Sequence, residues 1–228
     1  MFQYCLIVYR FVSRALRLTV PGVILASVQL SKSFANAPVT LSPLAKDEER
    51  EMLPAIVKAT LKKHFAFHDG KGDADKDNLS MAGFAKRFAV APRFHKRAGL
   101  FVTLSKAGET RACWGSLEGR YEDLVKATVY TTEAALTNEY RFSKITASEV
   151  DWLKPQVTVV TGLEPLRDLG HQNPGMYGML VRAGSKSGVI LPGETRDPYY
   201  QLVQCKLKAG IKPNQPCQIY RIKADVYR

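Results

Sequence analysis

The sequence is poor in the residues and motifs from which catalytic sites are most readily assigned. It contains only four histidines, four cysteines and two tryptophans among 228 residues. It has no HExxH zinc pattern, no Walker loop and no glycine-rich dinucleotide-binding motif. His64 and His68 have the spacing of a zinc pair on a helix, but no third ligand accompanies them. We therefore predict no metal site and no cofactor.

Residues 1–37 lack acidic side chains and contain only a short apolar run. That run, Leu18–Leu30, has 13 residues and follows a basic segment, whereas a membrane-spanning helix needs about 20 residues. The small residues Ser33 and Ala35 then fit a signal-peptidase site. We therefore predict a secretory signal in residues 1–37, cleaved before Asn36, and export of a mature chain without a spanning helix. An uncleaved membrane anchor, an organellar transit peptide and a start codon assigned too early, with a cytoplasmic protein, are the alternatives.

The rest of the chain is moderately basic. The whole sequence has a formal charge of +12, and residues 38–228 hold 29 Lys and Arg against 21 Asp and Glu. This balance favours an anionic small molecule or a partner protein as the ligand, and it is too modest to indicate nucleic acid.

The few cysteines allow two interpretations, one with a disulfide and one with reduced thiols only. Loss of a signal peptide would remove Cys5 and leave Cys113, Cys205 and Cys217, an odd number. Cys205 and Cys217 are the closest in sequence and could form a disulfide in an exported protein. The alternative is three buried, reduced cysteines.

The first part of the segment 47–98 has the apolar periodicity of a helix. Apolar residues recur at helical spacing over 47–64, although Pro54 predicts a kink or a later start. The aspartate-rich stretch 68–77 does not have the glycine and glutamate positions of an EF-hand, so we predict a solvated loop.

The segment Gly99–Leu117 predicts a β-hairpin. Apolar residues alternate over 100–104 and 111–114, on either side of the glycine-containing loop 105–109. Alternation along the second strand places Arg111, Cys113 and Gly115 on one face.

The remaining segments continue a mixture of helices and strands. We predict helices at 121–138, from the capping box at 146–149, and from Asp197–Pro198 to Gly210. We predict strands at 157–161, ended by Gly162, at 177–181 and 189–191 around a turn at 184–188, and at 218–224. Because these elements do not alternate as regular βαβ units, the fold class is α+β with mixed, largely antiparallel sheets and packing helices.

Cys113 is the candidate catalytic residue. Arg111 lies on the same face of the strand, and a guanidinium near a thiol lowers its pKa and favours the thiolate. A nucleophilic or redox cysteine would also need a base, for which His95 and His171 are the candidates. The alternative is that Cys113 is a small apolar core residue and that Arg111 pairs with a carboxylate.

An ordered series of short motifs resembles the AMMECR-type domain family, named for the Alport syndrome, midface hypoplasia and elliptocytosis chromosomal region. The family strand GxFVTL appears as Gly99–Leu104, and its hexapeptide LRGCIG aligns with Thr110–Gly115. Ala112 and Trp114 replace a glycine and an isoleucine of that hexapeptide, so this chain resembles a divergent member. Further matches are Arg141–Phe142, Leu191–Pro192, Cys205 and Lys208–Ile211.

The resemblance covers about residues 45–228, and we assign residues 38–228 to one AMMECR-type domain. It implies a two-lobed α+β fold with a cleft, and association with Memo-like and radical SAM proteins. It implies no particular molecular activity.

Three hypotheses about function follow. The first is binding of an anionic small ligand or a partner protein in a cleft, with Arg111, Cys113, Gly115 and Arg141 as ligand-binding residues. The second is an enzyme that uses Cys113 as a nucleophile or redox thiol. The third is an interaction module, for which we expect an exposed apolar patch and no cluster of perturbed titratable groups.

Overall fold

The computed structural model describes residues 46–68, 80–88 and 90–228. The predicted signal at 1–37 and nearly all of the predicted loop at 68–77 lie outside these residues. The chain divides into two units, Met1–Ala37 and Pro38–Arg228, and the second contains all the described structure. In the described ranges, no helix combines the length and the apolar character needed to span a membrane.

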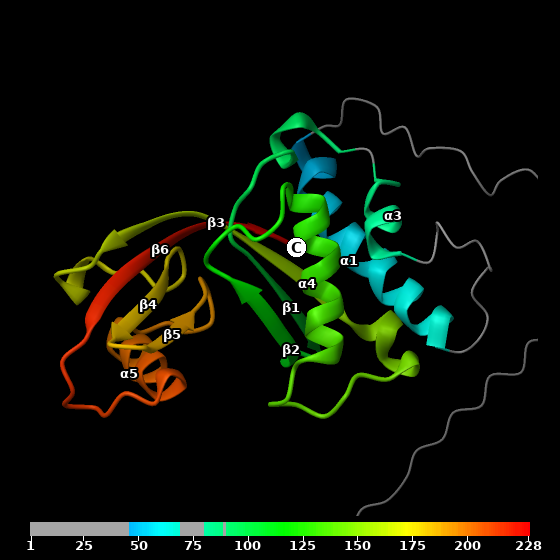
Figure 1. Ribbon diagram of the computed structural model, residues 1–228. Helices are drawn as coiled ribbons and strands as arrows, with labels where there is room; N and C mark the ends of the chain where they lie inside the picture. Colours follow the sequence, from blue (N-terminus) through cyan, green and yellow to red (C-terminus); the bar gives the residue numbers. More distant parts are fainter. Residues whose placement is uncertain (1–45, 69–79, 89) are drawn as a thin grey trace, which may run out of the picture. The chain divides into compact units, whose positions relative to one another are not determined.

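A single antiparallel sheet of six strands forms the centre of the described structure (Figure 1). Its strands in sheet order are β2 (Glu109–Ser116), β1 (Leu100–Lys106), β3 (Lys154–Pro165), β6 (Gln218–Tyr227), β4 (Gly178–Ala183) and β5 (Lys186–Ile190). β2 and β5 are therefore the two edge strands. The predicted α+β class is confirmed, with one sheet in place of several.

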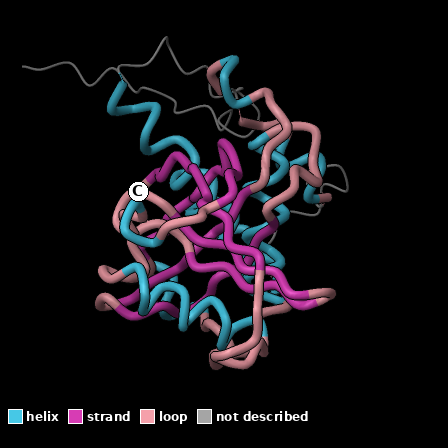
Figure 2. The backbone as a smooth tube through the Cα atoms, turned by 90° about the vertical axis from the view of Figure 1, so that its left-hand side faces the viewer, coloured by secondary structure: helices cyan, strands magenta, loops and turns pink. Residues whose placement is uncertain are grey.

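Four α-helices and three short 3₁₀ helices accompany the sheet in the described ranges. They are α1 (Lys46–His68), α3 (Met81–Ala85), α4 (Leu124–Thr137), α5 (Pro198–Ala209), η1 (Pro92–Phe94), η2 (Ala147–Trp152) and η3 (Leu169–His171). In Figure 2 the strands run through the middle and the helices lie around them.

The helix ends follow local capping signals. The Asp123 carboxylate accepts a hydrogen bond from the Lys126 N–H at 2.7 Å, so α4 begins at Leu124 and not at Tyr121 as predicted. Asp197 caps α5 through the Tyr200 N–H at 2.7 Å, and Gly210 ends it with a φ of 62°.

The helices cover one face of the sheet at its two ends. α1 and α4 pack on β1, β2 and β3, whereas α5 packs on β4 and β5. Tyr227 packs against the first core and Ile219 against the second, and the two-residue period places both on the same face of β6. On the opposite face, Phe101 of β1 and Val189 of β5 join one small apolar cluster. Because β1 and β5 are far apart in the sheet order, this cluster requires the sheet to curl around that face.

Two further predicted boundaries, at Gly162 and Gly188, were wrong. β3 does not end at Gly162 but continues to Pro165, with a shift of register between Val160 and Gly162. Gly188 lies inside β5 and not in a turn, because it pairs with Val181 of β4, and α5 passes close to it. The later start considered at Pro54 is not found, because α1 begins at Lys46 and includes this buried proline.

Candidate functional site

The hairpin strand β2 has the predicted alternation. Ala112 is buried and Trp114 packs against the α1–α4 core. The period of two therefore directs Arg111, Cys113 and Gly115 to the opposite face. The structure thus brings these three candidate residues together on one strand.

Arg111 is held by an acidic residue of the fold. Its Nε and Nη2 lie 3.1 and 3.3 Å from the two carboxylate oxygens of Glu149, and Lys106 adds a third contact at 3.2 Å. The hydrogen bond from Arg111 lowers the Glu149 pKa to about 2. This pairing matches the alternative in which Arg111 binds a carboxylate of its own chain.

Arg141 and Glu139 close the open edge of β2 at Cys113. The Cys113 N–H donates to Glu139 at 3.1 Å, and Arg141 Nη2 donates to the Cys113 carbonyl at 2.7 Å. Glu139 is only 4% exposed and also accepts from the Arg141 N–H at 2.9 Å. Burial raises the Glu139 pKa, but its hydrogen bonds with Arg141 and Cys113 outweigh burial and lower it to about 2. The pair therefore satisfies an edge strand that would otherwise present free peptide groups.

The surroundings of the Cys113 thiol favour its protonated form. Its pKa is raised, chiefly by burial, while a 3.4 Å hydrogen bond from the Thr103 hydroxyl lowers it by less. The charges of Glu194 and Lys208 also act on this thiol, but less than its burial does. No histidine of the described residues hydrogen-bonds to Cys113, and His171 pairs instead with Asp168 at 2.8 Å.

We therefore expect Cys113 to react slowly with an alkylating reagent at neutral pH. Iodoacetamide labelling of the native full chain, followed by peptide mass spectrometry, should give a slower rate at Cys113 than for free cysteine in the same buffer. Labelling in urea should remove the difference, because unfolding removes the burial that raises the pKa. A native rate above that of free cysteine would restore the nucleophile hypothesis.

The other cysteines form no disulfide, and the described histidines and cysteines form no metal site. Cys113, Cys205 and Cys217 are all free thiols, so the disulfide alternative is not found. Burial raises the Cys205 pKa to about 12. In the described residues no group of histidine, cysteine and carboxylate side chains could hold a metal ion, and His64 Nδ1 lies 2.8 Å from Glu133.

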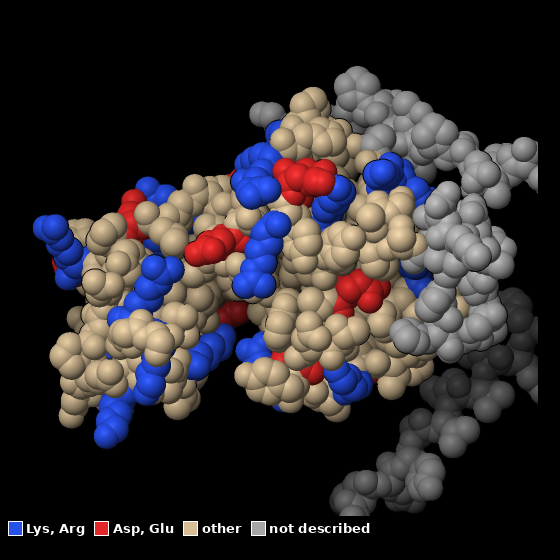
Figure 3. Space-filling view, in the orientation of Figure 1, with Lys and Arg blue, Asp and Glu red and all other residues tan. Residues whose placement is uncertain are grey.

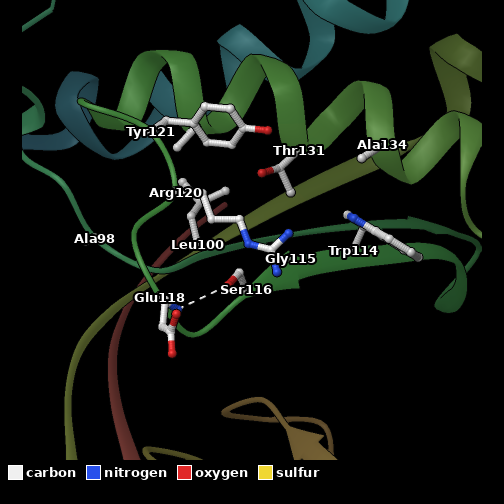
Figure 4. Close-up of a pocket in the computed structure, with 11 residues that line it drawn as sticks. Ala98, Leu100, Trp114, Gly115, Ser116, Glu118, Arg120, Tyr121, Thr131 and Ala134 are labelled. Carbon is white, nitrogen blue, oxygen red and sulfur yellow. Dashed lines mark hydrogen bonds between the residues drawn. The ribbon is translucent and has the colours of Figure 1, made fainter.

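A small pocket lies between the edge of β2 and helix α4 (Figure 4). Its volume is about 40 Å³. Residues that line it include Trp114, Gly115, Ser116, Arg120, Tyr121 and Thr131. Three of these, Trp114 to Ser116, directly follow Cys113 on β2.

Three hydrogen-bond donors of this pocket remain available. Arg120 has no acidic partner among the described residues, and Figure 4 shows its side chain extended between α4 and β2. The Thr131 hydroxyl has no hydrogen-bond partner within the same ranges, although Thr131 is 7% exposed. Because the Cys113 N–H points outward from the edge, the two-residue period directs the Gly115 N–H outward as well.

At Gly115 the two strands of the hairpin lie too close together for a side chain. A Cβ atom at this position would lie 2.4 Å from the Leu100 carbonyl oxygen and 2.4 Å from the Phe101 ring. Any side chain would therefore displace the strand that borders the pocket.

Sequence reasoning missed Arg120. Gly119 and Arg120 lie between the predicted hairpin and the next predicted helix, and neither belongs to a recognised motif. An arginine between a strand edge and a helix start is a weak signal, because most such arginines are solvated. Arg120 differs from Arg111 and Arg141 in having no carboxylate partner among the described residues.

A second, wider hollow lies between α1 and η2. It has a volume of about 400 Å³ and is lined by Lys58, Lys62, Asp151, Trp152 and Lys154, among others. It is not adjacent in sequence to the hairpin motif.

Comparison with known proteins identifies the family. The AMMECR1 family model matches residues 73–228. The chain is 34% identical over 139 residues to a protein of Thermotoga maritima, covering 59% of this chain and 80% of that protein. It is 27% identical over 203 residues to a protein of Methanothermobacter thermautotrophicus, covering 82% and 96%.

A solved structure has the same fold. The uncharacterized protein PH0010 from Pyrococcus horikoshii superimposes with a TM-score of 0.63 at 23% identity, covering 79% of this chain and 91% of that one. The motif series of the hairpin and the C-terminal half, the α+β fold and the family match all agree. The chain belongs to the AMMECR1 family.

Proposed function

We propose that this domain binds a small molecule through a carboxylate or phosphate group in the pocket between β2 and α4. The observation that carries the proposal is the Arg120 guanidinium, which lines the pocket without an acidic partner in the described part of the chain. Arg111 and Arg141, the arginines first proposed for this role, are each paired with a glutamate.

The pocket offers donors suited to an anion. A guanidinium can hold two oxygens of a carboxylate or phosphate in parallel hydrogen bonds. The outward Gly115 N–H and the Thr131 hydroxyl supply further donors from opposite sides of the pocket. Such fixed donors at a sheet edge favour negative charge.

The size of the pocket restricts the bound group. A volume of about 40 Å³ is far below the ~300–1,000 Å³ of pockets that enclose whole drug-sized ligands. We therefore infer that only the anionic head enters, and that an apolar part of the ligand lies against Trp114.

Replacement of Arg120 by alanine should weaken anion binding without unfolding the protein. The measurement is titration of the full chain with benzoate and, separately, inorganic phosphate. A Trp152→Phe background leaves Trp114 as the only tryptophan and its fluorescence as the signal. We expect a Kd of about 1 mM for the better probe, as for a small anionic fragment, and at least a tenfold increase on Arg120→Ala.

Matched variants test where the anion binds. Arg120→Lys keeps the charge but not the planar fork, so a partial loss is expected. Lys62→Ala and Lys154→Ala, in the wider hollow, should leave the Kd unchanged. Loss of binding in these lysine variants, with Arg120→Ala unaffected, would move the site to that hollow and refute the proposal. The Tm of Arg120→Ala should stay near that of the parent, since its exposed side chain has no partner in the described ranges.

A further inference from the structure

Helix α5 presents an apolar stripe to solvent. Tyr199, Tyr200, Val203 and Leu207 are 55–70% exposed and make up half of the exposed large hydrophobic residues in the described chain. Positions 199, 203 and 207 follow the i, i+4, i+8 spacing, so they lie along one side of the helix. Exposed apolar side chains scattered singly are ordinary, but a continuous stripe is not.

The other side of α5 is firmly attached to the sheet. Gln201 and Cys205 are fully buried, and the Gln201 side chain hydrogen-bonds to Gln172 at 2.9 Å and to the Tyr177 carbonyl at 3.1 Å. The stripe is therefore carried on a rigid support and cannot turn inward. This is the exposed patch expected of an interaction module.

The surroundings of the stripe are basic. Residues 178–217 contain six Lys and Arg and two acidic residues, and Figure 3 shows Lys and Arg outnumbering Asp and Glu over β4, β5 and α5. Both acidic residues are engaged, Glu194 with Lys208 at 3.3 Å and Asp197 as the cap of α5. The stripe is consequently flanked by positive charge.

Two of these charges are held in position by backbone carbonyls. Lys186 Nζ donates to the Gly210 carbonyl at 2.6 Å, and Lys206 Nζ donates to the Pro213 and Gln215 carbonyls at 2.6 and 3.0 Å. Fixed charges around a rigid apolar ridge suit a folded protein surface better than the mobile headgroups of a membrane.

We propose that α5 docks an amphipathic helix of a partner protein whose apolar face is flanked by Asp and Glu. Packing of two helices would bury the stripe of Tyr199, Val203 and Leu207, while the acidic flanks would meet the basic rim. A second copy of this chain would set like charges against each other. The chain's own residues 1–37 have four basic and no acidic residues, so they do not complement the rim either.

A pair of synthetic peptides tests this surface. The first is a fluorescein-labelled 18-residue helix with leucines at i, i+4 and i+7 spacing and glutamates on both flanks, and the second has lysines in place of the glutamates. Fluorescence anisotropy with the full chain should give at least tenfold tighter binding of the glutamate peptide. Leu207→Glu should weaken that binding at least tenfold and leave the Tm near the parent value. Leu163→Glu, the same change at an exposed leucine of β3, should not alter the affinity.

Three results would overturn the proposal. One is equal binding of the two peptides, or binding unchanged by Leu207→Glu. Another is co-sedimentation with phosphatidylserine vesicles that Leu207→Glu abolishes, which would assign the stripe to a membrane surface. The last is a dimer in sedimentation equilibrium that Leu207→Glu dissociates, which would make α5 an interface between copies.

Discussion

Replacement of Glu139 by alanine should lower the free energy of unfolding by about 3 kcal/mol. Glu139 is buried and accepts hydrogen bonds from the Cys113 N–H and from both the backbone and the guanidinium of Arg141. Its removal would leave the Cys113 N–H without its partner and Arg141 without a counter-charge. This loss of stability lies at the lower end of the range for breaking a buried ion pair, because the Arg141 side chain is 40% exposed. Urea denaturation of the full chain measures it.

A matched variant separates this effect from ordinary loss of a surface ion pair. Glu122→Ala removes an exposed glutamate that pairs with Lys126 four residues away, and it should change the stability by less than about 0.5 kcal/mol. Equal losses in the two variants would show that Glu139 does not hold the edge of β2.

The same carboxylates should make stability depend on acid pH. The pKa values of Glu139 and Glu149 fall from 4.5 to about 2 in the folded protein. The unfolded chain therefore binds more protons than the native one, so stability rises with pH in this range. The contribution is fully present above the unfolded pKa and is lost as pH falls from about 5 toward 2. Glu139→Gln should flatten this dependence, and an unchanged slope would contradict the assigned pKa shift.

Replacement of Gly188 by alanine should cost about 3 kcal/mol and loosen α5. A Cβ atom at Gly188 would lie 2.2 Å from the Cys205 carbonyl oxygen and 3.0 Å from the Ala209 Cβ. Because both contacts are with a helix held at both ends, either α5 or the edge strand β5 must move. Thermal denaturation measures the loss of stability, and faster alkylation of the buried Cys205 would report the displaced helix.

The matched control is another strand glycine without that contact. At Gly162 the nearest atoms to an added Cβ are 3.9 Å away, on the Lys223 side chain. Gly162→Ala should therefore stay within about 1 kcal/mol of the parent and can stabilise it by restricting the unfolded chain. If Gly188→Ala behaved like Gly162→Ala, the close approach of α5 to β5 would not constrain the fold.

The elements that were predicted correctly have their signals in neighbouring residues. Asp197, Pro198 and Gly210 define the ends of α5, because capping depends on hydrogen bonds within one helical turn. The hairpin and the shared face of Arg111, Cys113 and Gly115 follow from the two-residue period of a strand. The motif series identified the AMMECR1 family, which the family match confirms.

The partners of those side chains required the fold. Glu149 is 38 residues from Arg111, and Glu139 is 26 residues from Cys113. The capping box marks Glu149 as a helix-start residue but not as the partner of Arg111, and no local pattern distinguishes Glu139 from a solvated glutamate. The end of β3 was misplaced for a similar reason, since its pairing with β6 continues past Gly162.

Local sequence thus accounts for the family, the helix ends, the hairpin and the face on which Cys113 lies, because each depends on residues within one turn or one strand. The curled sheet decided which charges are paired and which remain available. It placed glutamates against Arg111 and Arg141, left Arg120 at a pocket without a carboxylate in the described ranges, and directed the α5 stripe to solvent. These outcomes depend on contacts between residues far apart in the chain, whose distances no local pattern encodes.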